Sequence, residues 1–379
     1  RDRSPSRGLG DVYKRQAEFG IISQRDFFDH DIAKMSSLGG YYIVRSEDFV
    51  YNPRISTSAP VGPINRNKLG RIGVMSPLYT VFRPHDIGTT YLEHFFKSKY
   101  WHSFMNFNGD SGARSDRFSI KDSVFFEMPI PIPHIEEQRK IGEYLTHLDR
   151  LITLHQRKYD KLTNMKKSML EKMFPKNGAN VPEIRFKGFT DAWEQRKLGE
   201  AVQEVTRNDA TSDAPIMMIT ANNGFIEQSE RYAFNNAGES LKKYILLEKG
   251  ELAYNHGASK LRPYGSCFTL TTSENARIPF VYHCFSADEQ NSEFLSIELN
   301  GADVENQLRR IVSSGARMDG LLNISFQEYV SVSVLLPTIE EQNKIADFFK
   351  NLDNLITLHQ RELEKLKNLK KACLEKMFV

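Results

Sequence analysis

The feature that most constrains this chain is an internal repeat. Residues 133–174 and 337–378 align without a gap over 42 positions at a constant offset of 204, and 26 of these positions are identical. Both copies carry IEEQ near the start, LITLHQR in the middle and LEKMF at the end. A match of this length indicates duplication, so we expect two units of one kind.

Outside these segments the repeat survives only as scattered anchors. A Tyr-Asn pair at 51–52 returns at 254–255, and Ser-Gly-Ala-Arg at 111–114 returns at 314–317. The chain therefore alternates variable and constant parts. This pattern predicts two copies of one framework that perform different versions of one task.

Each constant segment is predicted to be one long helix with a coiled-coil seam. Apolar residues recur at alternating steps of four and three, with His155 and His359 filling gaps in the seam as a polar pair that sets the register. Pro133 and Pro337 suit helix starts, and the acidic residues that follow favour the helix dipole. Forty helical residues span about 60 Å, which is too long to pack on one small domain. The natural partner of each helix is the other one, and the spacing permits either orientation.

The variable regions combine short strand candidates with helical stretches, which predicts a mixed α/β fold. Only the second unit has a lead-in sequence, at 176–200. We expect residues 1–16 to be non-native and the first unit to lack its opening strand.

Composition and missing motifs exclude several classes of protein. The formal net charge of +3 is only mildly basic, so nucleic-acid binding would have to come from local patches. Three cysteines without a CxxC pair suit a reducing cytoplasm and argue against a zinc site. No apolar run is long enough for a membrane helix. No phosphate-binding loop, dinucleotide-binding loop or amino-methyltransferase tetrad is present, and the Glu-Glu-Gln clusters follow helix starts, where dipole compensation or a partner contact explains them better than acid–base chemistry.

These motifs, with FKGFTDAWEQRKLGE at 186–200, resemble the specificity subunit of type I restriction–modification systems. The resemblance covers nearly all of residues 17–379. It implies an α+β fold in which two globular target-recognition domains are joined by two long antiparallel helices that form an intramolecular coiled coil. The expected parts are 1–16, non-native or disordered; 17–132, the first recognition domain, truncated at its N-terminus; 133–175, the first helix; 176–192, a linker; 193–336, the second recognition domain; and 337–379, the second helix.

The resemblance also implies function. Each domain would read one half of an interrupted DNA target, and because the domains differ in sequence the target would be asymmetric. Two methyltransferase subunits and the restriction subunits would be partners. We expect no catalysis and no cofactor in this chain, with S-adenosylmethionine, ATP and Mg²⁺ on the partner subunits.

Candidate DNA-binding residues come from polar, basic loops, because Arg and Lys contact phosphates while Arg and Asn can pair with bases. They are Asn52, Arg54, Arg66, Lys68, Arg71 and Arg114 in the first domain, and Asn255, His256, Lys260, Arg262 and Arg317 in the second. Solvated loops, a glycine turn at each Ser-Gly-Ala-Arg and a capping Asn after each Tyr are the structural alternatives.

Three other functions stay open at this point. The chain could be a remnant in which only the second domain reads DNA, a coiled-coil scaffold without a DNA role, or an enzyme with its own catalytic centre on the recognition domains.

Overall fold

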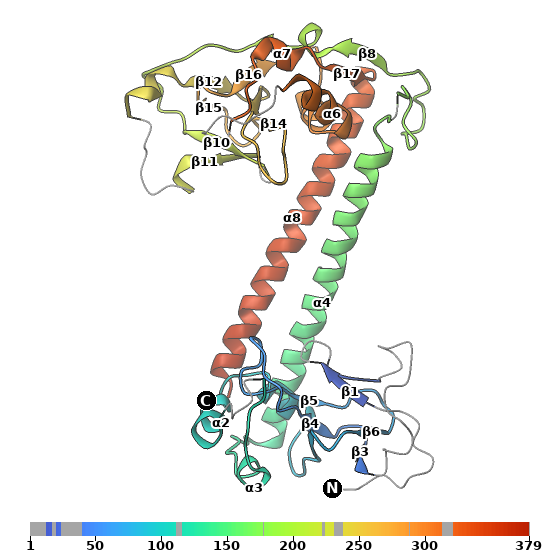
Figure 1. Ribbon diagram of the computed structural model, residues 1–379, viewed down its shortest axis with the longest axis vertical. Helices are drawn as coiled ribbons and strands as arrows, with labels where there is room; N and C mark the ends of the chain where they lie inside the picture. The colour runs from blue at the N-terminus through green and yellow to red at the C-terminus, as the bar shows by residue number, and fades with distance from the viewer. Residues whose placement is uncertain are drawn as a thin grey trace. The chain divides into compact units, whose positions relative to one another are not determined.

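The computed structural model describes residues 13–16, 20–23, 40–110, 116–176, 178–221, 224–230, 238–287, 289–312 and 321–378. The chain forms two compact units. Unit 1 comprises Arg1–Tyr159 with His359–Val379, and unit 2 comprises Asp160–Leu358. Both units are mixed α/β, and each contains part of both long helices (Figure 1). The predicted fold class is therefore confirmed, whereas the exact domain limits stay predictions.

Unit 1 builds its β-structure from short antiparallel pairings. β1 pairs with β2, β3 with β6, and β4 lies between β5 and β7. The elements are β1 Tyr13–Gln16, β2 Gly20–Ser23, β3 Tyr42–Val44, β4 Phe49–Tyr51, β5 Ile64–Arg66, β6 Gly73–Met75, β7 Thr80–Phe82, α1 Thr89–Phe95, α2 His102–Asn108, α3 Asp122–Phe125 and the first part of α4 Ile135–Lys172.

Unit 2 is larger and centres on a four-stranded sheet in the order β14-β13-β16-β9. Three further antiparallel pairs complete it: β10 with β11, β12 with β15, and β17 with β8. The strands are β8 Glu194–Lys197, β9 Gln203–Glu204, β10 Met217–Thr220, β11 Gly224–Glu227, β12 Ile245–Glu248, β13 Leu252–Asn255, β14 Ser266–Thr269, β15 Asn275–Ile278, β16 His283–Ser286 and β17 Ser333–Leu336. The helices are η2 Leu198–Glu200, η3 Gln228–Glu230, η4 Gly238–Lys243, α5 Ser292–Leu299, α6 Ala302–Ile311, α7 Phe326–Val330 and α8 Ile339–Lys376.

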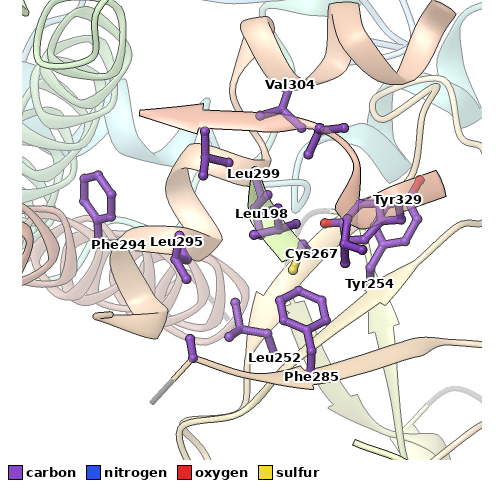
Figure 2. Close-up of a cluster of buried hydrophobic side chains, with 14 of the residues drawn as sticks. Leu198, Leu252, Tyr254, Cys267, Phe285, Phe294, Leu295, Leu299, Val304 and Tyr329 are labelled. Carbon is purple, nitrogen blue, oxygen red and sulfur yellow. The ribbon is translucent and has the colours of Figure 1, made fainter. Parts of the chain in front are cut away.

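The core of unit 2 joins its sheet to its helices (Figure 2). Tyr254 of β13 stacks on Tyr329 of α7 with ring centroids 3.9 Å apart, and Cys267 lies buried beside them. Burial raises the pKa of the Cys267 thiol to about 12, so it stays protonated. The prediction that Cys267 and Cys284 are buried small residues is confirmed.

The two long helices run antiparallel within each unit. In unit 1, Asp149 of α4 forms an ion pair with Lys370 of α8, and His155 lies opposite His359, with their Nδ1 atoms 3.1 Å apart. Numbers that rise along one helix therefore fall along the other. In unit 2 the Lys166 ammonium lies 2.6 Å from Asp353, and this pair is the repeat equivalent of Lys370 with Asp149.

A repeated glutamine fixes the start of each helix. Gln138 is buried, donates to the Pro133 carbonyl (2.8 Å) and accepts from the backbone N–H of Gly88 (2.8 Å). Gln342 likewise donates to the Pro337 carbonyl (2.9 Å) and accepts from the N–H of Asn291 (3.0 Å). The glutamine of IEEQ thus ties each long helix to the start of α1 or α5.

The last residues of each helix motif enter a domain core. Phe378 is 1% exposed and packs on Tyr91 and Phe95, with ring centroids 5.3 and 5.8 Å away. In unit 2 its counterpart Phe174 stacks on Phe294 at 5.7 Å. Within the described residues, no helix combines the length and apolar character that crossing a membrane requires.

This packing predicts that Phe378→Ala lowers the free energy of unfolding of unit 1 by about 3–5 kcal/mol, because the substitution removes a buried ring and leaves a cavity. Phe107→Ala is the matched control, since that ring is 90% exposed. Urea unfolding followed by circular dichroism measures both variants. Equal stabilities for the two variants would contradict the assigned packing of Phe378.

Candidate nucleic-acid interface

Each unit carries a hairpin loop between two paired strands. In unit 1 it connects β4 to β5, and in unit 2 it connects β13 to β14. The Tyr51 hydroxyl donates to the Val61 carbonyl (2.9 Å), and the Tyr254 hydroxyl donates to the Tyr264 carbonyl (2.6 Å). Both ties span 10 residues, and each Tyr pairs with the residue 13 positions later, Ile64 or Cys267, so the two hairpins share one internal tie that explains why the Tyr is kept in both copies.

The asparagine after each Tyr shapes the entry to the loop. The Asn52 side-chain oxygen accepts from the N–H of Arg54 (2.9 Å), and the Asn255 side-chain oxygen accepts from the N–H of Gly257 (2.9 Å). Such turns are characteristic of Asn. At the far end, Gly265 has φ +80°, and an added Cβ would lie 2.6 Å from the Asn255 carbonyl oxygen, so only glycine fits there.

A residue that follows the Ser-Gly-Ala-Arg segment in the sequence pairs with each hairpin loop. In unit 1 the backbones of Arg54 and Arg117 form a bridge, and Phe118 N–H donates to the Pro53 carbonyl (2.7 Å). In unit 2 the equivalent bridge joins Gly257 to Leu321. These bridges flank the Ser-Gly-Ala-Arg segments. We call the hairpin loop of each unit, together with the residues bridged to it, the loop pair of that unit.

The predicted DNA-binding residues lie in different parts of the structure. Arg54 is exposed on the loop pair of unit 1, with its guanidinium 3.3 Å from Asp116. Lys260 is exposed on the loop pair of unit 2. Arg114 and Arg317 lie outside the described residues. Arg71 is exposed between β5 and β6 and belongs to neither strand of the loop-pair bridge.

Two predicted residues of the second domain hold the loop pair from inside. His256 is 7% exposed, and its ring nitrogens lie 2.8 Å from the Leu322 carbonyl and 2.6 Å from the Val281 carbonyl. Arg262 donates to the Asn300 carbonyl (2.8 Å), and burial lowers its pKa. His256 is thus buried and Arg262 half-buried, and each is bonded to main-chain carbonyls of unit 2.

Arg66 and Lys68 belong to a groove between α1 and α4 in unit 1, with a volume of about 1030 Å³. The Arg66 side chain is 10% exposed and lies 2.8 Å from the Glu93 carboxylate, which Lys68 and Lys97 also approach to 3.0 Å. Burial raises the pKa of Glu93, but these lysines outweigh it and hold the pKa at about 2. Arg66 thus neutralises an internal charge, a role that its sequence position does not reveal.

Two further basic residues, which the sequence analysis did not select, lie at the loop pairs. Arg117 is half-buried beside Arg54. In unit 2 the Arg309 guanidinium lies 5.7 Å from the ring centroid of Tyr264, on the hairpin loop. Two sequence features could have pointed to them. Arg117 is the third residue after the repeated Ser-Gly-Ala-Arg, and Arg309 lies in the basic last turn of α6.

A family model described as the type I restriction modification DNA specificity domain matches residues 40–164 and 191–368. The chain belongs to this family. The two matched stretches together make up well over half of the chain and correspond to its two repeat units. The predicted resemblance is therefore confirmed.

Known members of the family align with this sequence at low identity. The type I restriction enzyme MjaVIII specificity subunit of Methanocaldococcus jannaschii is 24% identical over 275 residues, which is 66% of this chain and 61% of that protein. The chain thus matches about three-fifths of the length of its curated relatives.

Solved structures of specificity subunits also match. The type I restriction–modification S subunit from M. genitalium has a TM-score of 0.51 at 12% identity, covering 89% of this chain and 84% of that one. The HsdS subunit from Thermoanaerobacter tengcongensis has a TM-score of 0.43 at 18% identity, covering 89% and 81%. The first of these likenesses shows the fold that the specificity-domain family shares with this chain.

The groove gives a testable pH dependence through His94, which is 1% exposed and whose Nε2 lies 3.1 Å from the Thr146 hydroxyl. Burial, aided by Lys97, lowers the pKa of His94 to about 4. The unfolded chain therefore binds the proton first as the pH falls below about 6.5, and unit 1 loses about 2 kcal/mol of stability between pH 7.5 and 5.

Urea unfolding at these two pH values measures the effect. His94→Gln should reduce the loss, whereas His85→Gln, at a side chain that is 92% exposed, should leave it unchanged. An unaltered pH dependence in His94→Gln would show that other groups cause it.

Proposed function

We propose that this chain is the DNA-recognition subunit of a type I restriction–modification complex. In this proposal it reads a bipartite, asymmetric target and positions methyltransferase and restriction subunits on the DNA. The observation that carries the proposal is the repeated loop pair. One main-chain framework, with its Tyr tie and Asn turn, presents different exposed side chains in the two units.

The chemistry of the loop pairs supports DNA as the ligand. Arg54, Arg117, Lys260 and Arg309 bring positive charge to the loops or their edges, which suits phosphate contact. Different side chains at matching loop positions would give different base preferences. Because unit 1 and unit 2 differ in this way, their half-sites would differ as well.

The reaction itself would belong to the partners. We propose that this chain does no chemistry and that S-adenosylmethionine, ATP and Mg²⁺ are bound by the methyltransferase and restriction subunits. Such a complex acts on DNA in the cytoplasm. Mapping of methylated adenines in cells that carry the chain with its partner subunits tests this directly, because a two-part asymmetric motif is expected.

A point substitution tests the role of the loop pair in unit 2. Lys260→Ala should weaken binding to every duplex and reduce the slope of log K against log salt by about 1, as expected for one lost phosphate contact. Lys187→Ala is the matched control, because it removes an exposed lysine from the linker instead. Fluorescence anisotropy across a salt series gives both slopes, and identical slopes would remove Lys260 from the interface.

The shared helices offer a test of the bipartite target. Seven residues inserted after Arg157 in α4 and after Arg361 in α8 keep the heptad register and add about 10 Å of helix, or about three base pairs of DNA. We expect the methylated target to keep its two half-sites and to gain about three base pairs between them. An unchanged spacer in the methylation map would refute the idea that helix length sets the gap.

A further inference from the structure

His256 is the first residue after β13, and its ring joins three segments of unit 2. Its Nδ1 lies 2.8 Å from the Leu322 carbonyl oxygen, and its Nε2 lies 2.6 Å from the Val281 carbonyl oxygen. Val281 belongs to the turn between β15 and β16, whereas Leu322 belongs to the segment bridged to the hairpin loop. We call these two side-chain bonds the His256 clasp.

Both partners of the ring are carbonyl oxygens, which can only accept hydrogen bonds. A neutral imidazole has one N–H and one bare nitrogen, so it can donate to only one of them. The bare nitrogen would then face an oxygen at 2.6 or 2.8 Å, lone pair against lone pair. A flipped ring is no remedy, because C–H···O contacts are normally about 3.3–3.6 Å long. Only the imidazolium, which donates from both nitrogens, satisfies both oxygens.

The surroundings of the ring suit one buried cation. The His283 ring of β16 stacks on His256 with centroids 5.2 Å apart, and the Tyr254 ring of β13 lies 6.3 Å away. His283 donates through Nε2 to the Ile324 carbonyl (3.0 Å). Burial, together with nearby His256, lowers the pKa of His283, and burial raises the pKa of Tyr254. Both neighbours therefore stay neutral, and the one positive charge of this ring stack lies on His256.

The clasp fastens the two parts of the loop pair to each other. Gly257 and Leu321 form the main-chain bridge, and the Leu322 N–H donates to the carbonyl of His256 (2.9 Å). His256 thus bonds Leu322 through both its main chain and its side chain. The exposed Lys260 lies on the same hairpin loop. The position of this loop against residues 321–324 therefore depends on the protons of one ring.

Unit 1 builds the same main-chain bond without an ionisable ring. Pro53 stands at the position of His256, at the offset of 203, and Thr80 pairs with Tyr51 as His283 pairs with Tyr254. The Phe118 N–H donates to the Pro53 carbonyl (2.7 Å), as the Leu322 N–H does to His256. Proline has no side-chain donor, and threonine does not titrate. A pH effect that comes from the clasp therefore belongs to unit 2.

We propose that His256 is a positioning residue, which holds the loop pair of unit 2 in place for DNA only while both of its ring nitrogens are protonated. This role rests on the proposed function, because the surface that it positions is the one that would read DNA. Loss of one proton leaves a bare nitrogen against a carbonyl oxygen, so one of the two bonds breaks. The clasp is therefore closed at low pH and opens as the pH rises, and the affinity for DNA falls in the same direction.

The first measurement counts the protons on the ring and needs no DNA. In the full chain with ¹⁵N-labelled histidine, a long-range ¹H–¹⁵N spectrum shows whether one or both nitrogens of each ring are protonated. The His256 signals are those that disappear in His256→Gln, or in His256→Lys if the first variant does not fold. We expect two protons on His256 at pH 6. A single proton at that pH would overturn the proposal.

The second measurement tests the positioning role by the pH profile of DNA binding. Fluorescence anisotropy follows a mixed-sequence duplex from pH 6 to 8.5 at constant salt. Wild-type affinity should fall by up to about tenfold per pH unit once the ring loses its proton, as expected for one linked proton. His256→Gln should bind more weakly than the wild type at pH 6 and should lack this fall. His85→Gln, at a side chain that is 92% exposed in unit 1, should keep it.

A lysine variant separates the role of the charge from a general loss of fold. His256→Lys keeps a positive charge and only donates, and lysine stays charged throughout this pH range. It should therefore bind the duplex equally well at pH 6 and 8.5. The same pH profile in the wild type and both variants would overturn the positioning role. A wild-type chain with two protons on His256 that binds no duplex would instead refute the proposed function, and the DNA role of the clasp with it.

Discussion

The structure depends on the burial of each long helix's last aromatic residue in a domain core. Phe378 enters the core of unit 1, although α8 begins in unit 2, and Phe174 enters the core of unit 2, although α4 begins in unit 1. Unit 1 therefore needs the end of α8 to complete its core, whereas the core of unit 2 lies within the continuous stretch Asp160–Leu358. This requirement explains why LEKMF is kept in both copies, since loss of either ring would leave a cavity.

The contacts between the two long helices also recur from one unit to the other. The ion pair of Asp149 with Lys370 in unit 1 is repeated by Lys166 with Asp353 in unit 2, and His155 meets its own repeat counterpart, His359. Exposed ion pairs contribute little stability on their own. Their value here lies in register, because only the antiparallel arrangement brings each of these residues to its partner.

The sequence was sufficient for the repeat, the long helices and the mixed α/β units, because these follow from periodicity and duplication. It left the helix orientation open, since that depends on contacts between residues about 200 positions apart. It also could not separate Arg54 from Arg66. Both are arginines in or near polar loops, yet one is exposed and the other pairs with Glu93 inside the fold. Such a difference is decided by tertiary packing, which local composition does not encode.

The residues repeated in both units have a physical explanation, because they hold the loops in shape, whereas the exposed residues between them differ. The Tyr hydroxyl tie and the Asn turn recur in both units as bonds within the protein, and the glycine with positive φ at the loop's far end recurs as Gly62 and Gly265. A hairpin loop closed by such internal bonds depends less on its exposed side chains for its shape. Lys260 can therefore differ from its counterpart in unit 1 without refolding the domain. Under the proposed function, this division allows two dissimilar half-sites to be read by one duplicated framework.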